Sequence, residues 1–212
     1  MVSTYSEAGV DIDASERATE ALIAQIKGVN RKGDGEAIKL DNGFAGLVKL
    51  GDGALAMCTD GVGSKILLAE EMDSIHTVGI DCVAMNTNDL ICVGAEPLSF
   101  VDYVALDKPD EKLMAKIGIG LAEGCKQSNC TLSGGETAIL PELVHGFDIA
   151  GTSVGYVKQD KIIDGTKISE GNVLIGLKSS GPHSNGYTLI RKLFDGDKEL
   201  GKKLVEPTRI YV

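Results

Sequence analysis

The sequence contains no tryptophan and few other aromatic residues, with four Phe and five Tyr among 212 residues. A hydrophobic core must therefore be built mainly from Val, Ile, Leu, Ala and Met. No apolar run approaches the roughly 18 residues that a membrane-spanning helix needs. The N-terminus lacks the basic start and the apolar stretch of a signal peptide. These absences predict a cytoplasmic protein without a membrane partner.

Basic clusters are also missing, and the net charge is −10. A nucleic-acid backbone requires a concentrated positive patch, so this charge argues against a nucleic-acid partner. An acidic protein can still bind a nucleotide when metal ions mediate the contact with the phosphates. The five cysteines are odd in number, and Cys125 and Cys130 lack the CxxC spacing of a zinc or redox pair. We expect reduced and mostly buried thiols.

Hydrophobic periodicity predicts alternating helices and strands, which indicates a two-layer α/β protein with a mixed sheet packed by helices. In the first helix, Asp13 and Glu16 have the spacing of a capping box. Residues 30–46 are rich in Gly, Asp and Asn and are expected to form a mobile loop. Helices are expected over residues 13–29, 82–97, 111–128 and 185–194. Strands are expected over residues 46–50, 54–59, 76–81, 98–106, 147–158 and 173–181.

The first stretch with chemical potential is "TDGVGSK" (59–65), between an expected strand and an apolar run. A Walker A loop does not fit, because three residues separate Gly61 from Lys65 and Ser64 precedes the lysine. A dinucleotide fingerprint would need a third glycine where Ile66 stands. A carboxylate, a Gly-x-Gly backbone and a cation remain, which suits an oxyanion site. A plain turn capped by Asp60 is the alternative.

The second stretch is "GIDCVAMNTNDL" (79–90), where Asp81 is expected at a strand–helix junction. Asn88 follows two helical turns later on nearly the same face, with Asp89 beside it. A buried, unpaired carboxylate is costly, so a metal ion is an economical partner for these side chains. A helix N-cap at Asp81 and a solvated polar stripe are the alternatives.

The third stretch, "LSGGETAILPELVHG" (132–146), again presents a carboxylate, Glu136, at an expected backbone bend. Ligands of open α/β sheets gather at the carboxyl ends of strands. Asp60, Asp81 and Glu136 therefore form a candidate site in which Mg²⁺ bridges phosphate oxygens.

The fourth stretch, "KSSGPHSNGYTLIRKL" (178–193), opens an expected helix with hydroxyl groups and backbone N–H groups. Such a helix start suits an anion. His183 could add a charge or a proton, or it could simply form a hydrogen bond at the helix start.

These four stretches, together with "YSEAGVDID" (5–13), "GAEPLSFVDY" (94–103) and "PTRIYV" (207–212), closely resemble the phosphoribosylformylglycinamidine cyclo-ligase family of purine biosynthesis. The resemblance implies an N-terminal ATP-binding domain over residues 1–168 and the first strand and helix of a second, truncated domain over residues 169–212. It also implies a homodimer whose sheets close into a shared barrel. Two departures are a shortened loop in "LDNGFAGLVKL" (40–50) and Ile139-Leu140-Pro141, where the family commonly has Glu-Met-Pro.

The resemblance implies that ATP and formylglycinamidine ribonucleotide give aminoimidazole ribonucleotide, ADP and phosphate, with Mg²⁺ as cofactor. The implied metal ligands are Asp60, Asp81, Asp89 and Glu136. The implied catalytic residues are Asp60, Lys65 and His183. The implied nucleotide-binding residues are Lys27, Gly61, Gly63, Ser64, Lys65, Asn88, Gly134, Gly135 and Thr137. The implied substrate-binding residues are Ser180, Gly181, His183, Ser184 and Asn185.

Two other functions remain open at this point. One is a truncated, non-catalytic fragment that dimerises or binds nucleotide, because the family's second domain is longer than residues 169–212. The other is a related ATP-dependent kinase or synthetase that acts on a different acceptor.

Overall fold

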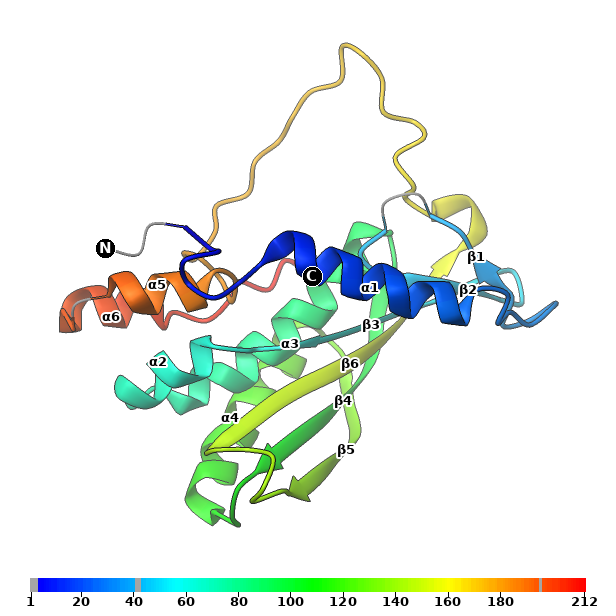
Figure 1. Cartoon of the computed structure of the whole chain (residues 1–212). Coiled ribbons are helices and arrows are strands. Elements are labelled where there is room, and N and C mark those ends of the chain that lie inside the picture. The colour runs from blue at the N-terminus through cyan, green and yellow to red at the C-terminus, as the bar shows by residue number, and fades with distance from the viewer. Residues whose placement is uncertain (1–3, 41–42, 195) are drawn as a thin grey trace.

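A computed structural model describes residues 4–40, 43–194 and 196–212. One layer is a six-stranded sheet with the strand order β1-β2-β3-β6-β4-β5 (Figure 1). Every neighbouring pair is antiparallel except β4 and β5, which are parallel and joined by a helix. The expected mixed α/β architecture is therefore confirmed. The strands are β1 (Ala37–Ile38), β2 (Gly46–Leu50), β3 (Gly53–Gly61), β4 (Glu96–Leu106), β5 (Thr131–Ile139) and β6 (Phe147–Lys158).

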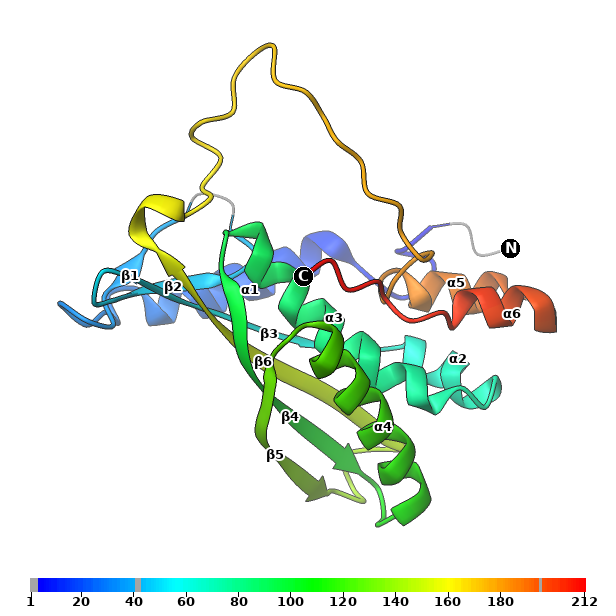
Figure 2. The ribbon, with the colours of Figure 1, turned by 180° about the vertical axis from the view of Figure 1, so that it is seen from behind.

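The second layer consists of helices α3 and α4, which pack side by side against one face of the sheet (Figure 2). The first helix begins two residues earlier than its capping-box spacing predicts, because Asp11 caps it by accepting a hydrogen bond from Ala14 N. A short 3-10 helix, η1, spans Gln159–Lys161. The α-helices are α1 (Ile12–Ile26), α2 (Lys65–Glu71), α3 (Ile75–Cys92), α4 (Glu111–Gln127), α5 (Tyr187–Leu193) and α6 (Lys198–Leu204).

The strand expected over residues 76–81 is wrong, because α3 begins at Ile75 and continues through this segment. Its side chains are buried around most of the helix, including Thr77, Val78 and Cys82. A helix buried on nearly all sides loses the one-sided pattern that distinguishes it from a short buried strand. Asp81 consequently lies in the middle of a helix rather than at a strand end.

The strand expected over residues 173–181 is also absent. This segment belongs to an extended excursion away from the rest of the molecule (Figure 1). Val173, Leu174 and Ile175 are 83%, 98% and 86% exposed. A strand needs a neighbouring strand for its ladder of hydrogen bonds, and none of the strands in the described residues pairs with this segment.

Residues 30–46 were expected to form a mobile loop, but β1 lies within this segment and pairs with β2. Outside the ladder, Gly35 N donates to Lys49 O and Lys49 N donates to Glu36 O. Residues 41 and 42 lie outside the described residues.

The main hydrophobic core lies between the sheet and helices α3 and α4. Phe100 of β4 is fully buried there. Gly120 of α4 faces α3. A Cβ atom on Gly120 would lie 2.1 Å from His76 O, so only glycine permits this helix–helix distance. The close approach fixes the position of α3, which carries Asp81, Asn88 and Asp89.

The opposite face of the sheet keeps apolar side chains exposed. Met57, Val101 and Tyr103 are 39%, 39% and 44% exposed. We call this surface the open sheet face, and its other members include Leu55, Thr59, Thr152 and Val154. Among the helices in the described residues, none is both long and apolar enough to cross a membrane.

Candidate functional site

A cavity of about 340 Å³ lies where two distant stretches of the sequence meet. One wall is the end of β3 and the turn after it, from Asp60 to Ser64, and the other runs from Ser184 into the start of α5 at Thr188. Ser64 Oγ lies 3.0 Å from Thr188 Oγ1, so a hydrogen bond joins the walls directly. The structure thus brings together the first and fourth stretches identified in the sequence. The remaining lining residues are Tyr5, Val10 and Met85.

The first wall takes its shape from the end of β3. Asn86 of α3 donates to Asp60 O at 3.2 Å, which holds the strand end against the helix. Gly63 has φ +64, a left-handed conformation that glycine adopts without strain. Space around Gly63 is open, since a Cβ there would meet no atom within 4 Å. The turn can therefore present its backbone to a ligand.

Asp60 and Asp89 form an acidic pair beside this wall. Cys58 Sγ donates to Asp89 Oδ2 at 3.1 Å, which places Asp89 next to β3. Burial and the negative charge of Asp60 raise the pKa of Asp89, against the opposing effect of the Cys58 hydrogen bond. A cation would relieve both the burial cost and the repulsion. The pair is a candidate for binding a metal ion together with water and phosphate oxygens.

Asp102 of β4 is a further acid that the sequence reading overlooked. Asp60 and Asp102 both pair with Gly151 of β6, so the two carboxylates share the helix-covered face of the sheet. Burial raises the pKa of Asp102. A Cβ on Gly135 would lie 2.4 Å from Asp102 Oδ1, so this glycine makes room for the carboxylate. The alternation of residues 98–106 was the available signal, since it places Asp102 between the buried Phe100 and Val104.

Lys65 and Asp81 lie inside the protein rather than on the cavity wall. Lys65 Nζ donates to Asp81 Oδ1 at 2.9 Å, and both side chains are fully buried. Asp81 Oδ1 also accepts from Thr208 N and Thr208 Oγ1, both at 2.7 Å. Burial lowers the pKa of Lys65, while the carboxylate of Asp81 acts in the opposite direction. Lys65 was expected to contact phosphates and Asp81 to bind metal, but both are engaged within the chain.

Asn88 is also engaged within the chain. Its Nδ2 donates to Arg209 O at 2.8 Å, and its Oδ1 accepts from Tyr211 N at 2.9 Å. Asp81 and Asn88 therefore hold residues 208–211 along α3. The polar residues in this helix bind the chain's own backbone, a partner that the sequence reading did not consider.

The third stretch does not join the site within one chain. Residues 131–139 form a single strand, so Glu136 lies within β5 rather than at a bend. It pairs with Tyr103, which points to the open sheet face, whereas Asp60 points to the helix-covered face. Gly134 and Thr137 lie in the same strand. Lys27 is the exposed C-cap residue of α1 and does not line the cavity.

The fourth stretch contributes residues with two different roles. Ser184 and Asn185 line the cavity. Ser180 Oγ instead donates to Pro207 O at 2.7 Å. Gly181 has φ +140 and provides the bend that precedes the wall.

His183 lies just behind this wall. It has φ +60, and its Nε2 lies 3.4 Å from Tyr211 Oη. Burial, helped by the charge of Lys65, lowers the pKa of His183 and favours the neutral ring.

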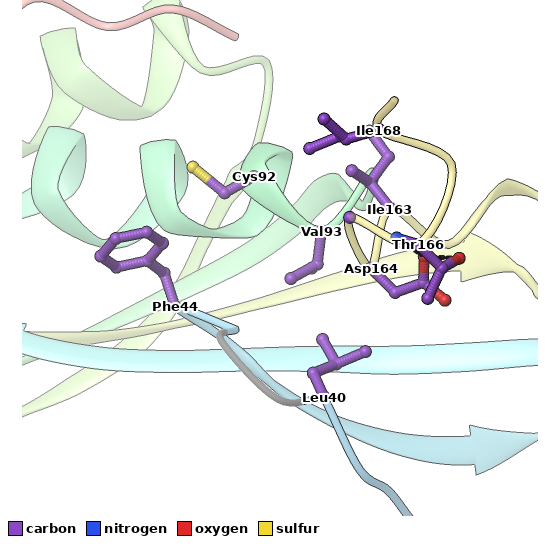
Figure 3. Close-up of a pocket in the computed structure, with 9 residues that line it drawn as sticks. Leu40, Phe44, Cys92, Val93, Ile163, Asp164, Thr166 and Ile168 are labelled. Carbon is purple, nitrogen blue, oxygen red and sulfur yellow. Dashed lines mark hydrogen bonds between the residues drawn. The ribbon is translucent and has the colours of Figure 1, made fainter. Parts of the chain in front are cut away.

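A second cavity, of about 570 Å³, lies at the far end of α3 (Figure 3). Phe44, Val93 and Ile163 supply apolar walls. Cys92 also lines it and is exposed, unlike the buried thiols that the sequence predicts. None of the site residues expected from the sequence lines this cavity.

No group of three or more His, Cys, Asp or Glu side chains in the described residues could hold a metal ion by itself. Mg²⁺ commonly binds through one or two carboxylates and completes its coordination with water and substrate phosphates. The pair of Asp60 and Asp89 fits that mode of binding. The structure does not support the four-carboxylate set expected from the sequence within one chain.

Comparison with known proteins identifies the family of this chain. Residues 42–157 match the family model "AIR synthase related protein, N-terminal domain", and residues 169–212 match the corresponding C-terminal domain model. The phosphoribosylformylglycinamidine cyclo-ligase of Methanosarcina acetivorans is 49% identical over 99% of this chain, which spans 66% of that relative. The cyclo-ligase of Methanobrevibacter smithii is also 49% identical over 99% of this chain, which spans 65% of it.

A solved structure of AaThiL complexed with AMPPCP and TMP is similar in fold. It has a TM-score of 0.53 at 17% identity and covers 69% of this chain and 43% of its own. The matched domain models and the shared mixed sheet lead to one conclusion. The chain belongs to the AIR synthase related protein family.

Proposed function

We propose that this chain carries the ATP-dependent cyclo-ligase reaction, converting formylglycinamidine ribonucleotide into aminoimidazole ribonucleotide with release of ADP and phosphate. The observation that carries this proposal is the cavity in which the Asp60–Ser64 turn faces residues 184–188. Family membership and the names of the relatives support the reaction. Because the chain spans 66% of the length of those relatives, the activity is a proposal for this chain.

The reaction requires activation of an amide oxygen, which is a poor leaving group. The γ-phosphoryl group of ATP is transferred to the formyl amide oxygen, an internal nitrogen then attacks the same carbon, and phosphate leaves with the oxygen. Reactions of this type depend on positioning and on neutralising phosphate charge. Bound Mg²⁺ would supply that neutralisation, and Asp60 and Asp89 are the residues that would hold it.

The remaining residues of the cavity position the reactants. Gly63 and Ser64 would direct backbone N–H groups and a hydroxyl group towards the ATP phosphates, whereas Gly61 N already donates to Asp60 Oδ1. Ser184 and Asn185 would hold the ribonucleotide on the opposite wall. The two walls thus bring the phosphoryl donor and the acceptor together.

The test replaces Asp60 with Asn, which keeps the shape of the side chain and removes its charge. We expect loss of Mg-ATP binding by calorimetry and loss of product formation, with an unchanged unfolding temperature because Asp60 is exposed. Asp160→Asn is the matched control, since Asp160 is exposed in η1 and away from the cavity. Unchanged ATP affinity in Asp60→Asn would count against the proposal.

We further propose a homodimer formed through the open sheet face. Exposed Met57, Val101 and Tyr103 lie together on this face, and apolar surface of this kind commonly marks an interface. Light scattering at micromolar concentration should give twice the chain mass, and Val101→Asp should give the single-chain mass. A wild-type monomer would refute the homodimer.

A second function, nucleotide binding without turnover, is favoured by the exposed excursion. Val173, Leu174 and Ile175 lack neighbours in the part of the chain described here. The test assays activity with and without the part of the Methanosarcina acetivorans relative that this chain does not match. Turnover only in its presence would assign this chain the nucleotide-binding part of the reaction.

A further inference from the structure

The buried lysine that follows the first turn connects four separate parts of the chain. Lys65 Nζ donates to Asp81 Oδ1, to His183 O and to Glu206 O, at 2.9, 2.8 and 2.8 Å. It also lies 5.5 Å from the centre of the Tyr187 ring, within the range of a cation–π interaction. All three protons of the ammonium group are therefore used in hydrogen bonds. Lys65 has no free donor for a phosphate in this conformation.

One of these contacts holds a strained backbone. His183 has φ +60, which is unfavourable for a residue with a side chain. Such conformations persist where the surrounding structure fixes them. The carbonyl group of His183 is fixed by a hydrogen bond from a buried charged donor, a stronger type than one between neutral groups. The next two residues, Ser184 and Asn185, line the cavity.

Asp81 extends this connection to the segment after α6. It binds Thr208 through the backbone N and through Oγ1. Thr208 Oγ1 lies 2.9 Å from Ser184 Oγ, so Thr208 joins the buried pair to the cavity wall. Thus Lys65 reaches the wall through His183, and Asp81 reaches it through Thr208.

We propose that the buried Lys65–Asp81 pair positions residues 183–185 relative to the Asp60–Ser64 turn. The pair thereby sets the distance between the two walls that the acceptor ribonucleotide requires. The pair acts through the wall and touches neither reactant. The identity of the acceptor rests on the proposed function above, whereas the positioning of the wall is a property of the chain itself.

The test compares the double variant Lys65→Met/Asp81→Leu with Lys65→Met alone. Lys65→Met leaves a buried carboxylate without its countercharge and is expected to unfold at lower temperature. The double variant removes both charges, and apolar replacement of a buried pair is often neutral for stability. The double variant should therefore recover part of the lost unfolding temperature, because no unpaired charge remains, without recovering the hydrogen bonds to residues 183, 206 and 208. Lys116→Met, which breaks the exposed pair with Asp73, is the matched control.

Two measurements follow the wall in the double variant. Amide hydrogen exchange at residues 183–186 and 206–209 should accelerate by about tenfold or more, because a hydrogen bond to a charged group is lost in each segment. Exchange in α4 should stay unchanged. The KM for formylglycinamidine ribonucleotide should rise by roughly tenfold while the affinity for ATP stays unchanged, since Asp60 and Asp89 are untouched.

Each outcome decides the inference. If amide hydrogen exchange at residues 183–186 in the double variant is as slow as in the wild type, the positioning role is overturned. A fall in ATP affinity would also overturn it, because that result would indicate a direct contact of Lys65 or Asp81 with nucleotide or metal. If the double variant has the wild-type KM and the wild-type unfolding temperature, the pair has only a structural role. A wild-type chain without turnover would contradict the proposed function, and the exchange and ATP-binding measurements would still decide this inference.

Discussion

The two walls of the cavity are supported by different kinds of interaction. The Asp60–Ser64 turn follows the central strand β3, whose apolar side chains pack with Leu90 of α3 in a second apolar cluster, and Val62 of the turn belongs to the core around Phe100. Residues 183–185 and 206–211 instead depend on buried or half-buried polar side chains, mainly Lys65, Asp81 and Asn88. Apolar packing tolerates small shifts, whereas hydrogen bonds depend on distance and direction. The second wall should therefore be displaced by changes that leave the first wall intact.

The largest expected effect lies under the first wall. In Gly120→Ala, the new Cβ would meet His76 O at 2.1 Å, so α3 and α4 must separate. We expect a loss of about 3 kcal/mol or more in the free energy of unfolding, measured in urea, because core overpacking is costly. Gly118→Ala, in the same helix with open space around it, should instead be neutral or stabilising by up to about 1 kcal/mol. Equal effects of the two substitutions would contradict the proposed helix contact.

A smaller and more local effect is expected at the second wall. Asn88→Ala removes the hydrogen bonds to Arg209 O and Tyr211 N and should cost about 1–2 kcal/mol. Trypsin should then cleave after Arg209 more rapidly, as followed by mass spectrometry, while α4 stays protected. Asn172→Ala, in the exposed excursion, is the control and should leave this cleavage rate unchanged. An unchanged rate in Asn88→Ala would show that residues 209–211 are held by other contacts.

The smallest expected effect concerns the charge of Asp102. Burial raises its pKa above the ordinary value of about 3.9. The protonated form is therefore favoured by folding, and the associated stability is lost as pH rises through the folded-state pKa. Asp102→Asn should thus stabilise the protein at pH 7. The gain should be less than about 1 kcal/mol, because the side chain is partly exposed. The variant should also show a weaker dependence of stability on pH above 4. Thermal unfolding between pH 4 and 8 measures this, and a destabilised Asp102→Asn would indicate that the carboxylate has a favourable partner.

The sequence allowed much of the compact part of the fold to be predicted. Leu113, Ile117, Leu121 and Cys125 recur every four residues, which predicts the inward stripe of α4. The last three are buried and Leu113 is half-buried. Residues 76–81 were misassigned because a fully buried helix has no polar face to reveal its period. Residues 173–181 have the composition of a strand, but composition does not supply a neighbour to pair with.

The sequence indicates which segments form the candidate site, but it does not indicate which of their side chains contact one another. The turn at Asp60 and the start of α5 were both identified, and they face each other across the cavity. Two of the three hydrogen-bond partners of Lys65 lie 118 and 141 residues later in the chain, so local spacing could not reveal them. The placement of Glu136 depends on the irregular register between β4 and β5, which shifts between Phe100 and Val101. Asp102 was predictable in principle, because it occupies a position of β4 whose side chain faces the buried side of the sheet.

The excursion after η1 has a consequence for how this protein behaves at high concentration. Its "VLIGL" segment (173–177) combines high β-propensity with no charge and no proline, the composition of segments that assemble into intermolecular sheets. Because the segment is held away from the body, it is free to pair with the same segment of another molecule. Such assembly would grow without a fixed stoichiometry, in contrast to a closed pair of sheets. A charged residue in place of Ile175 should therefore raise the solubility limit while leaving the cavity between Asp60–Ser64 and residues 184–188 unaltered.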